Sequence, residues 1–72
     1  MNDNLKNLAA RITSLRKQRN LTIEKLAYGN GLSKGRLSEL ERARGNPTLA
    51  TLSKIAEGLD ISLSELLNFD EK

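Results

Sequence analysis

The segment from Thr22 to Arg42 constrains the fold of this 72-residue chain more than any other. Apolar residues recur three and four positions apart on both sides of a short interruption, which predicts helices over about 22–28 and 33–42. The interruption, residues 29–32, reads Gly-Asn-Gly-Leu, and Gly and Asn tolerate the left-handed backbone that turns a chain sharply. Ser33 suits the start of the second helix, because its hydroxyl can accept from an early backbone N–H. Two helices joined in this way form a helix-turn-helix unit, which can present a polar helix to a DNA groove.

Further apolar stripes at helical spacing predict three more helices, over about residues 4–19, 49–59 and 63–68. Their stripes comprise Leu5, Leu8, Ala9, Ile12 and Leu15, then Leu49, Leu52, Ile55, Ala56 and Leu59, then Leu63, Leu66, Leu67 and Phe69. The expected helix starts are Asp3 or Asn4, Thr48 and Ser62, and the expected ends are Asn20, Gly58 and Asp60. No stretch alternates with period two, and residues 70–72 are expected to fray. The sequence thus predicts an all-α fold, a compact bundle of about five short helices in one domain, residues 1–72.

Several protein classes are excluded by what the sequence lacks. There is no Cys and no His, so a metal site built from these residues is excluded and no cofactor is expected. No apolar run approaches the roughly 18 residues of a membrane helix, and the N-terminus lacks the basic flank and apolar core of a signal peptide. With no P-loop and no paired carboxylates on a cleft-forming face, an enzyme is not expected. We therefore expect a cytoplasmic protein without a catalytic site.

Charge is distributed unevenly along the chain. Residues 1–47 contain ten Lys or Arg and four Asp or Glu, whereas residues 48–72 contain two and five. A basic surface attracts polyanions because binding releases counterions, although ordinary solubility charge explains the asymmetry equally well. Among the basic residues, Arg11, Lys17 and Arg19 are expected to be mostly solvated. Aromatic residues are one Tyr and one Phe, which argues against single-strand binding by base stacking.

Several short motifs, in their order and spacing along the chain, together resemble those of a known protein family. They are Ile12 to Arg16, Leu21-Thr22 with Leu26-Ala27, Gly31-Leu32-Ser33, Leu37 to Arg42, Asn46 to Leu49, Leu52, Ile55-Ala56, Leu59 and Leu63 with Leu66-Leu67. In these the chain resembles the Cro/CI-type, or XRE-type, helix-turn-helix family of phage and bacterial regulators. The resemblance implies a lambda-repressor-like DNA-binding domain in which the helix from Ser33 enters the major groove.

The resemblance also implies which residues read bases. The positions that match the family's base-reading ones are Lys34, Gly35, Ser38 and Glu39, with Arg36 on the flank. Chemically, Lys34 can donate to guanine O6 and N7, and Glu39 can accept from cytosine N4; Glu39 could equally be a plain surface residue that supports a neighbouring Arg. Arg16 and Glu41 match a pair that in the family joins the first and third helices by a salt bridge, and a pair of unrelated surface charges is the alternative.

Phosphate contacts are expected from residues around this helix, namely Lys25, Ser33, Arg42, Arg44, Asn46 and Thr48. Residues 46–49 open a helix, whose free N–H groups favour an anion.

The chain departs from the family pattern in three places. Ile23 replaces a Gln that touches the DNA backbone, Ala43 replaces a Gly so that the loop could follow another path, and Gly35 replaces a base-reading side chain. Gly35 either allows close backbone approach to DNA or is simply tolerated near a helix start.

The function expected from these residues is sequence-specific binding of double-stranded DNA by a transcriptional regulator, a small dimeric repressor reading a near-palindromic operator. The expected homodimer surface is apolar and consists of Ile61, Leu63, Leu67 and Phe69. With no room for a separate ligand-binding domain, control would come from concentration, dimerisation or a regulatory protein partner. The alternatives are an antitoxin, a restriction–modification controller protein, or an interaction module that has lost DNA binding. By resemblance, the protein would be bacterial or from a phage and associated with the nucleoid.

Overall fold

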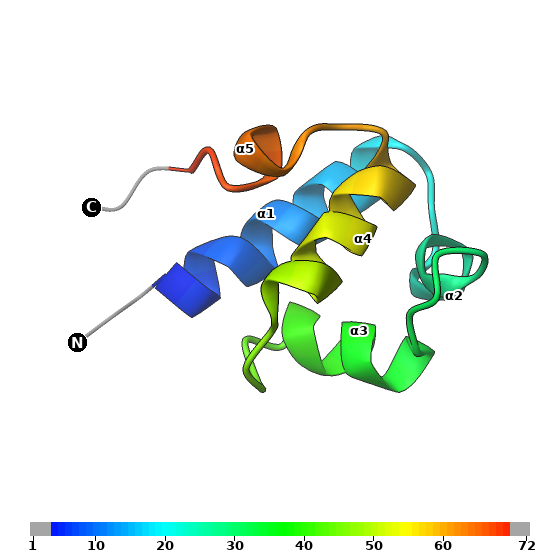
Figure 1. Cartoon of the computed structure of the whole chain (residues 1–72), viewed down its shortest axis with the longest axis horizontal. Helices are drawn as coiled ribbons and strands as arrows, with labels where there is room; N and C mark the ends of the chain where they lie inside the picture. The colour runs from blue at the N-terminus through cyan, green and yellow to red at the C-terminus, as the bar shows by residue number, and fades with distance from the viewer. Residues whose placement is uncertain (1–3, 70–72) are drawn as a thin grey trace.

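Hydroxyl side chains begin four of the five helices in this computed structural model, which describes residues 4–69 (Figure 1). The helices are α1 (Asn4–Gln18), α2 (Ile23–Ala27), α3 (Lys34–Glu41), α4 (Leu49–Leu59) and α5 (Leu63–Leu66). The caps of the last four are Thr22, Ser33, Thr48 and Ser62, each accepting from the backbone N–H three residues on. Residues 4–69 contain no strand, so the all-α prediction is confirmed, although α5 ends two residues before the predicted Asn68. The predicted cap Asp3 and the predicted tail 70–72 lie outside the described residues.

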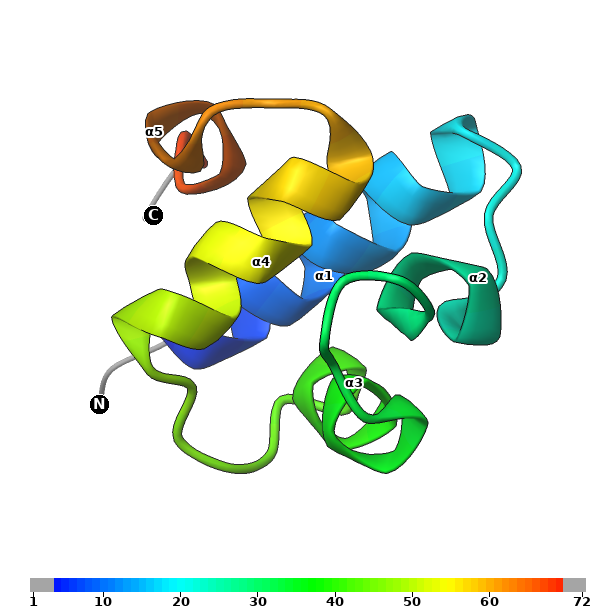
Figure 2. The same cartoon turned by 45° about the vertical axis from the view of Figure 1, so that its right-hand side comes forward.

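Helices α1 and α4 run through the middle of the molecule, with α3 and α5 on opposite sides of them (Figures 1 and 2). One apolar cluster joins all five helices, and its innermost side chains are Ile12, Leu26, Leu37, Ile55, Leu59 and Leu66. Because the core contacts only the inner face of α3, the opposite face of that helix is left at the surface. No helix within the described range is both long and apolar enough to cross a bilayer.

Three helices end at a residue in the left-handed conformation that is not glycine: Asn20, Ala43 and Asp60, with φ of 56°, 59° and 60°. At each end the N–H of this residue bonds the carbonyl three residues back, and the next N–H bonds the carbonyl five residues back. This is the Schellman arrangement. Asn20 and Asp60 were predicted as helix ends and have side chains that tolerate the conformation. Ala43 adopts the left-handed conformation although its side chain does not favour it.

The predicted bounds of α4, residues 49–59, are correct, but one prediction about its buried face is wrong. Leu49 was expected on the buried stripe, yet it is 66% exposed, because the first turn of α4 extends beyond the core. Gly58 and Asp60, which were expected to mark the end of the helix, lie in its last turn and at its C-cap. A Cβ on Gly58 would sit 2.7 Å from Leu26 Cδ1 and 2.9 Å from Asn30 Nδ2, so glycine here permits α4 to approach α2 and the turn that follows it.

Two arginines of α1 bond the ends of later helices, although they were expected to be mostly solvated. Arg11 Nη2 donates to the carbonyl of Glu65 at 2.8 Å, near the end of α5. Arg19 Nε donates to the carbonyl of Leu59 at 2.8 Å, at the last residue of α4. Cations are favoured at helix C-termini because they complement the helix dipole. Lys17 is exposed, as expected.

Candidate nucleic-acid interface

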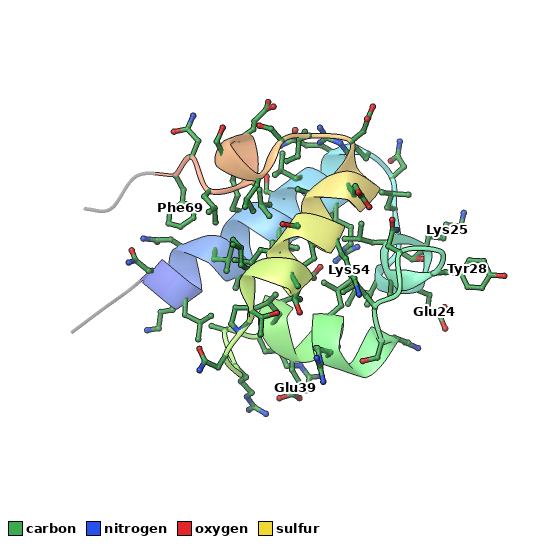
Figure 3. All side chains as sticks on the ribbon, viewed as in Figure 1. Glu24, Lys25, Tyr28, Glu39, Lys54 and Phe69 are labelled. Atoms are coloured by element: carbon green, nitrogen blue, oxygen red, sulfur yellow. The ribbon has the colours of Figure 1, made fainter. Side chains whose placement is uncertain are left out.

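Helix α3 presents a polar face outward because its two leucines anchor the other face. Leu37 and Leu40 are almost completely buried, whereas the residues between and before them face solvent. The side chains at the surface are Lys34, Arg36 and Glu39, with Gly35 beside them and Ser38 partly buried. Figure 3 shows Glu39 pointing away from the body of the molecule. The five residues predicted to read bases therefore lie on or beside one accessible helix face.

The end of α3 is fixed to α1 by Arg16 and Glu41, the two residues expected to pair. Arg16 Nε donates to Glu41 Oε2 at 2.7 Å and Nη2 donates to Oε1 at 3.0 Å, which makes the pair bidentate. The third nitrogen, Nη1, donates to the carbonyl of Leu21 at 2.7 Å. Only 12% of the Arg16 side chain and 8% of the Glu41 side chain are exposed. The hydrogen bonds to Glu41 raise the pKa of Arg16, against the opposite effect of burial, so Arg16 stays charged and the pair sets the position of α3.

The start of α3 is set by the turn that precedes it. Gly29 and Gly31 have φ of 84° and 72°, the left-handed conformation that glycine adopts without cost. Between them, Asn30 donates its side-chain amide to the carbonyl of Leu26 at 2.7 Å. Leu32 then packs against the core, and Ser33 Oγ accepts from the N–H of Arg36 at 2.9 Å. The turn thus delivers Lys34 to the surface as the first residue of α3.

Predicted base-reading and phosphate-binding residues meet in one cleft of about 520 Å³ between α3 and the start of α4. Its polar lining includes Ser33, Arg36, Glu39, Arg44, Asn46 and Thr48. The Thr48 hydroxyl accepts from the N–H of Thr51 and donates to its hydroxyl, both at 3.1 Å. Within residues 4–69, the N–H groups of Leu49 and Ala50 have no acceptor. An anion at this helix start would therefore bind backbone N–H groups rather than the Thr48 hydroxyl.

The other two residues expected to contact phosphates, Arg42 and Lys25, do not line this cleft. Arg42 is exposed at the end of α3. Lys25 lies on α2, where it projects outward together with Glu24 and Tyr28 (Figure 3). These three residues and Lys34 line a second hollow. Lys34 already has an ion-pair partner within the protein, because its Nζ lies 3.1 Å from Glu24 Oε2.

The three departures from the family pattern have different structural outcomes. Ile23 packs against the hydrophobic core and so contributes to stability. Ala43 adopts the left-handed conformation that a glycine would have supplied, and Gly45 follows with φ of 84°. Gly35 is helical, and a Cβ added there would meet no atom within 4 Å. Nothing in the fold requires glycine at position 35.

The apolar residues expected to form a dimer surface are largely occupied by the fold. Ile61, Leu63 and Phe69 are partly buried and pack against the core, whereas Leu67 is 38% exposed. Leu67 and Phe69 line one groove with Leu5, Leu8 and Pro47. Leu49 and Tyr28 are exposed as well, although nothing in the sequence distinguishes either from a residue that packs inward.

A family model described as helix-turn-helix matches residues 12–66, which is most of the chain. The chain belongs to the Cro/CI-type helix-turn-helix family. The predicted resemblance and the lambda-repressor-like fold are therefore confirmed. DNA binding and transcription regulation are the functions of this family.

Curated members of the Cro/CI-type family are similar over most of this chain. The transcriptional regulator SutR of Escherichia coli K12 is 39% identical over 61 residues, and the immunity repressor of Bacillus phage phi105 is 42% identical over 57 residues. These matches cover 85% and 79% of this chain but only 34% and 40% of the relatives. The chain thus spans about a third of SutR and two fifths of the phage repressor.

A solved structure of the family is similar over nearly its whole length. The restriction–modification controller protein C.AhdI of Aeromonas hydrophila superposes with a TM-score of 0.85 and is 32% identical. The superposition covers 90% of this chain and 98% of C.AhdI. C.AhdI thus shares the fold of this chain, and the curated regulator and phage repressor are similar to it in sequence.

Proposed function

We propose that this protein is a sequence-specific, double-stranded DNA-binding repressor of transcription that acts as a homodimer. The observation that carries the proposal is the outward polar face of α3, held by the buried Leu37 and Leu40. A helix of this size fits the major groove of B-DNA, which is about 12 Å wide. Likeness to a phage immunity repressor supports repression rather than activation.

Base reading belongs to the first two turns of α3. Lys34 donates to guanine O6 and N7, and Glu39 accepts from cytosine N4. Glu39 is exposed on a surface that approaches a polyanion, so it penalises any sequence that does not offer a donor. Ser38 can donate or accept, and Arg36 contacts the flank of the site.

Phosphate binding belongs to residues on both sides of α3. Arg42, Arg44 and Lys25 supply charge, and the N–H groups of Leu49 and Ala50 supply donors at the start of α4. These contacts fix the register of the protein on DNA without selecting a sequence. We propose that the whole chain, residues 1–72, acts as one domain in the cytoplasm, associated with the nucleoid.

A second copy is needed because one α3 reads only a few base pairs. Two recognition helices about 34 Å apart read the half-sites of a near-palindrome. We place the dimer surface at Ile61, Leu63, Leu67 and Phe69. The exposed Leu67 and its groove with Leu5 and Pro47 support this region, since exposed apolar patches mark interaction sites.

A restriction–modification controller is the second candidate, and the superposition with C.AhdI favours it. A controller and a repressor share the DNA chemistry proposed above and differ in the gene that they regulate. Footprinting the protein on the DNA around its own gene distinguishes the two, because a controller protects a site beside a restriction–modification operon.

Selection of bound duplexes from a random pool tests the proposed function directly. We expect a near-palindromic consensus, with an affinity that falls steeply as salt rises. Lys34→Ala should relax the preference at one position, at a cost of about 1–3 kcal/mol. Arg44→Ala should weaken binding to all duplexes alike and flatten the salt dependence. Absence of salt-dependent binding to any duplex would refute the proposal in favour of an interaction module.

A further inference from the structure

The base-reading Lys34 is paired within the protein to a carboxylate of the neighbouring helix. Its Nζ lies 3.1 Å from Glu24 Oε2, and the two side chains are 64% and 69% exposed. The residues are ten positions apart, in the first turns of α3 and α2. The other ion pair of the described residues, Arg16 with Glu41, is buried and bidentate. The Glu24–Lys34 pair is therefore the exchangeable one, since an exposed ion pair contributes little to stability.

From this geometry we propose that Glu24 is a positioning residue that raises sequence specificity by withholding Lys34 from DNA phosphates. The inference rests on the proposed DNA-binding function. On DNA without the right base, Lys34 stays with Glu24, so one cation fewer is available for phosphate contact. On the operator, a guanine edge in the groove replaces Glu24 as the acceptor.

The affinity of a protein for DNA depends on how many phosphates its cations neutralise. Each phosphate neutralised by a Lys or Arg adds about 0.9 to the steepness of the salt dependence. Counterion release is taken to contribute nothing at about 1 M salt. One extra phosphate contact then raises the affinity for DNA about fivefold at roughly 0.15 M salt. Glu24 thus lowers affinity for DNA in general by this factor, while the operator complex, in which Lys34 contacts a base, loses less. The ratio of the two affinities rises.

The position of Glu24 supports this role over one in stability. Glu24 projects outward from α2 (Figure 3), and Lys34 is its one ion-pair partner within residues 4–69. The helix start is already capped by Thr22, whose hydroxyl accepts from the N–H of Lys25 at 3.0 Å. Replacement of the carboxylate by an amide therefore leaves the cap and the core unchanged.

Glu24→Gln tests the inference, and Glu57→Gln is the control matched in charge. Glu57 is exposed near the end of α4 that lies far from α3 (Figures 1 and 2). The probes are a random-sequence duplex and a duplex selected by the wild-type protein, titrated at several salt concentrations. For Glu24→Gln we expect about fivefold tighter binding to the random duplex, a salt dependence steeper by about one unit, and a smaller gain on the selected duplex. In a Lys34→Gln background, Glu24→Gln should have no more effect than Glu57→Gln.

Equal effects of Glu24→Gln and Glu57→Gln would overturn the inference, because only net charge would then matter. Equal gains on the random and selected duplexes would also overturn it, because specificity would be unchanged. Both outcomes leave the proposed function intact, since the wild type still binds a selected duplex. A wild type that binds no duplex in a salt-dependent way would instead remove the proposed function and this inference together.

Discussion

Replacement of Gly35 by alanine should have opposite effects on the stability of the fold and on the affinity for DNA. Gly35 is the second residue of α3, its backbone is helical, and an added Cβ meets nothing within 4 Å. A helical glycine is less stable than alanine by about 0.5–1 kcal/mol. Gly35→Ala should therefore stabilise the protein by up to this amount, which raises the melting temperature by about 2–8 °C for a domain of this size.

The same substitution should weaken binding to DNA. If glycine allows the backbone of α3 to approach a base pair closely, a methyl group there forces the two surfaces apart. Extra methyl groups in close-packed contacts typically cost about 1–3 kcal/mol, and we expect a loss in this range on a selected duplex. Thermal unfolding and a DNA titration of the same preparation measure both effects.

Ala50→Gly is the matched control for the stability effect. Ala50 is the second residue of α4 and is exposed, and like Gly35 it follows a hydroxyl cap by two positions. It should lose about the stability that Gly35→Ala gains. A Gly35→Ala protein that is more stable and binds DNA as tightly as the wild type would refute the close approach of the α3 backbone to DNA. The remaining explanation would be that glycine is simply tolerated near a helix start.

Three further predictions concern single positions. Ala43→Gly should stabilise the protein by about 1 kcal/mol in chemical denaturation, because alanine pays for the left-handed conformation at the end of α3; an unchanged midpoint would contradict it. Gly58→Ala should destabilise by about 1–3 kcal/mol, because its Cβ would overlap Leu26 and Asn30, and a neutral result would mean that the turn can shift. Leu67→Glu should shift the mass in sedimentation at tens of micromolar from dimer to monomer; a wild type that is already monomeric would contradict the dimer.

The sequence predicted most of the local structure because the information is local. Hydroxyl caps at Thr22, Ser33, Thr48 and Ser62 precede apolar stripes, and the helix starts that follow them are correct. The outward face of α3 follows from the spacing of Leu37 and Leu40. What failed depends on neighbours distant in the chain.

Leu49 continues a regular stripe, but periodicity carries no information on where the core ends. Gly58 resembles a helix stop in the sequence. In the structure, glycine is needed there because Leu26 and Asn30, about thirty residues earlier, approach the helix closely. The contact between Glu24 and Lys34 spans a turn, and no helical spacing relates the two residues. The residues of the candidate interface and the Arg16–Glu41 pair were thus predictable, whereas the Glu24–Lys34 pair was not.

The arginines of α1 reach the final turns of three later helices: Arg16 at Glu41 of α3, Arg19 at Leu59 of α4 and Arg11 at Glu65 of α5. During synthesis on the ribosome, α1 emerges before each of these partners, so each guanidinium group stays hydrated until its own partner helix is available. Truncation from either end therefore removes one side of these contacts. Folding of this chain should accordingly be all-or-none rather than stepwise along its length.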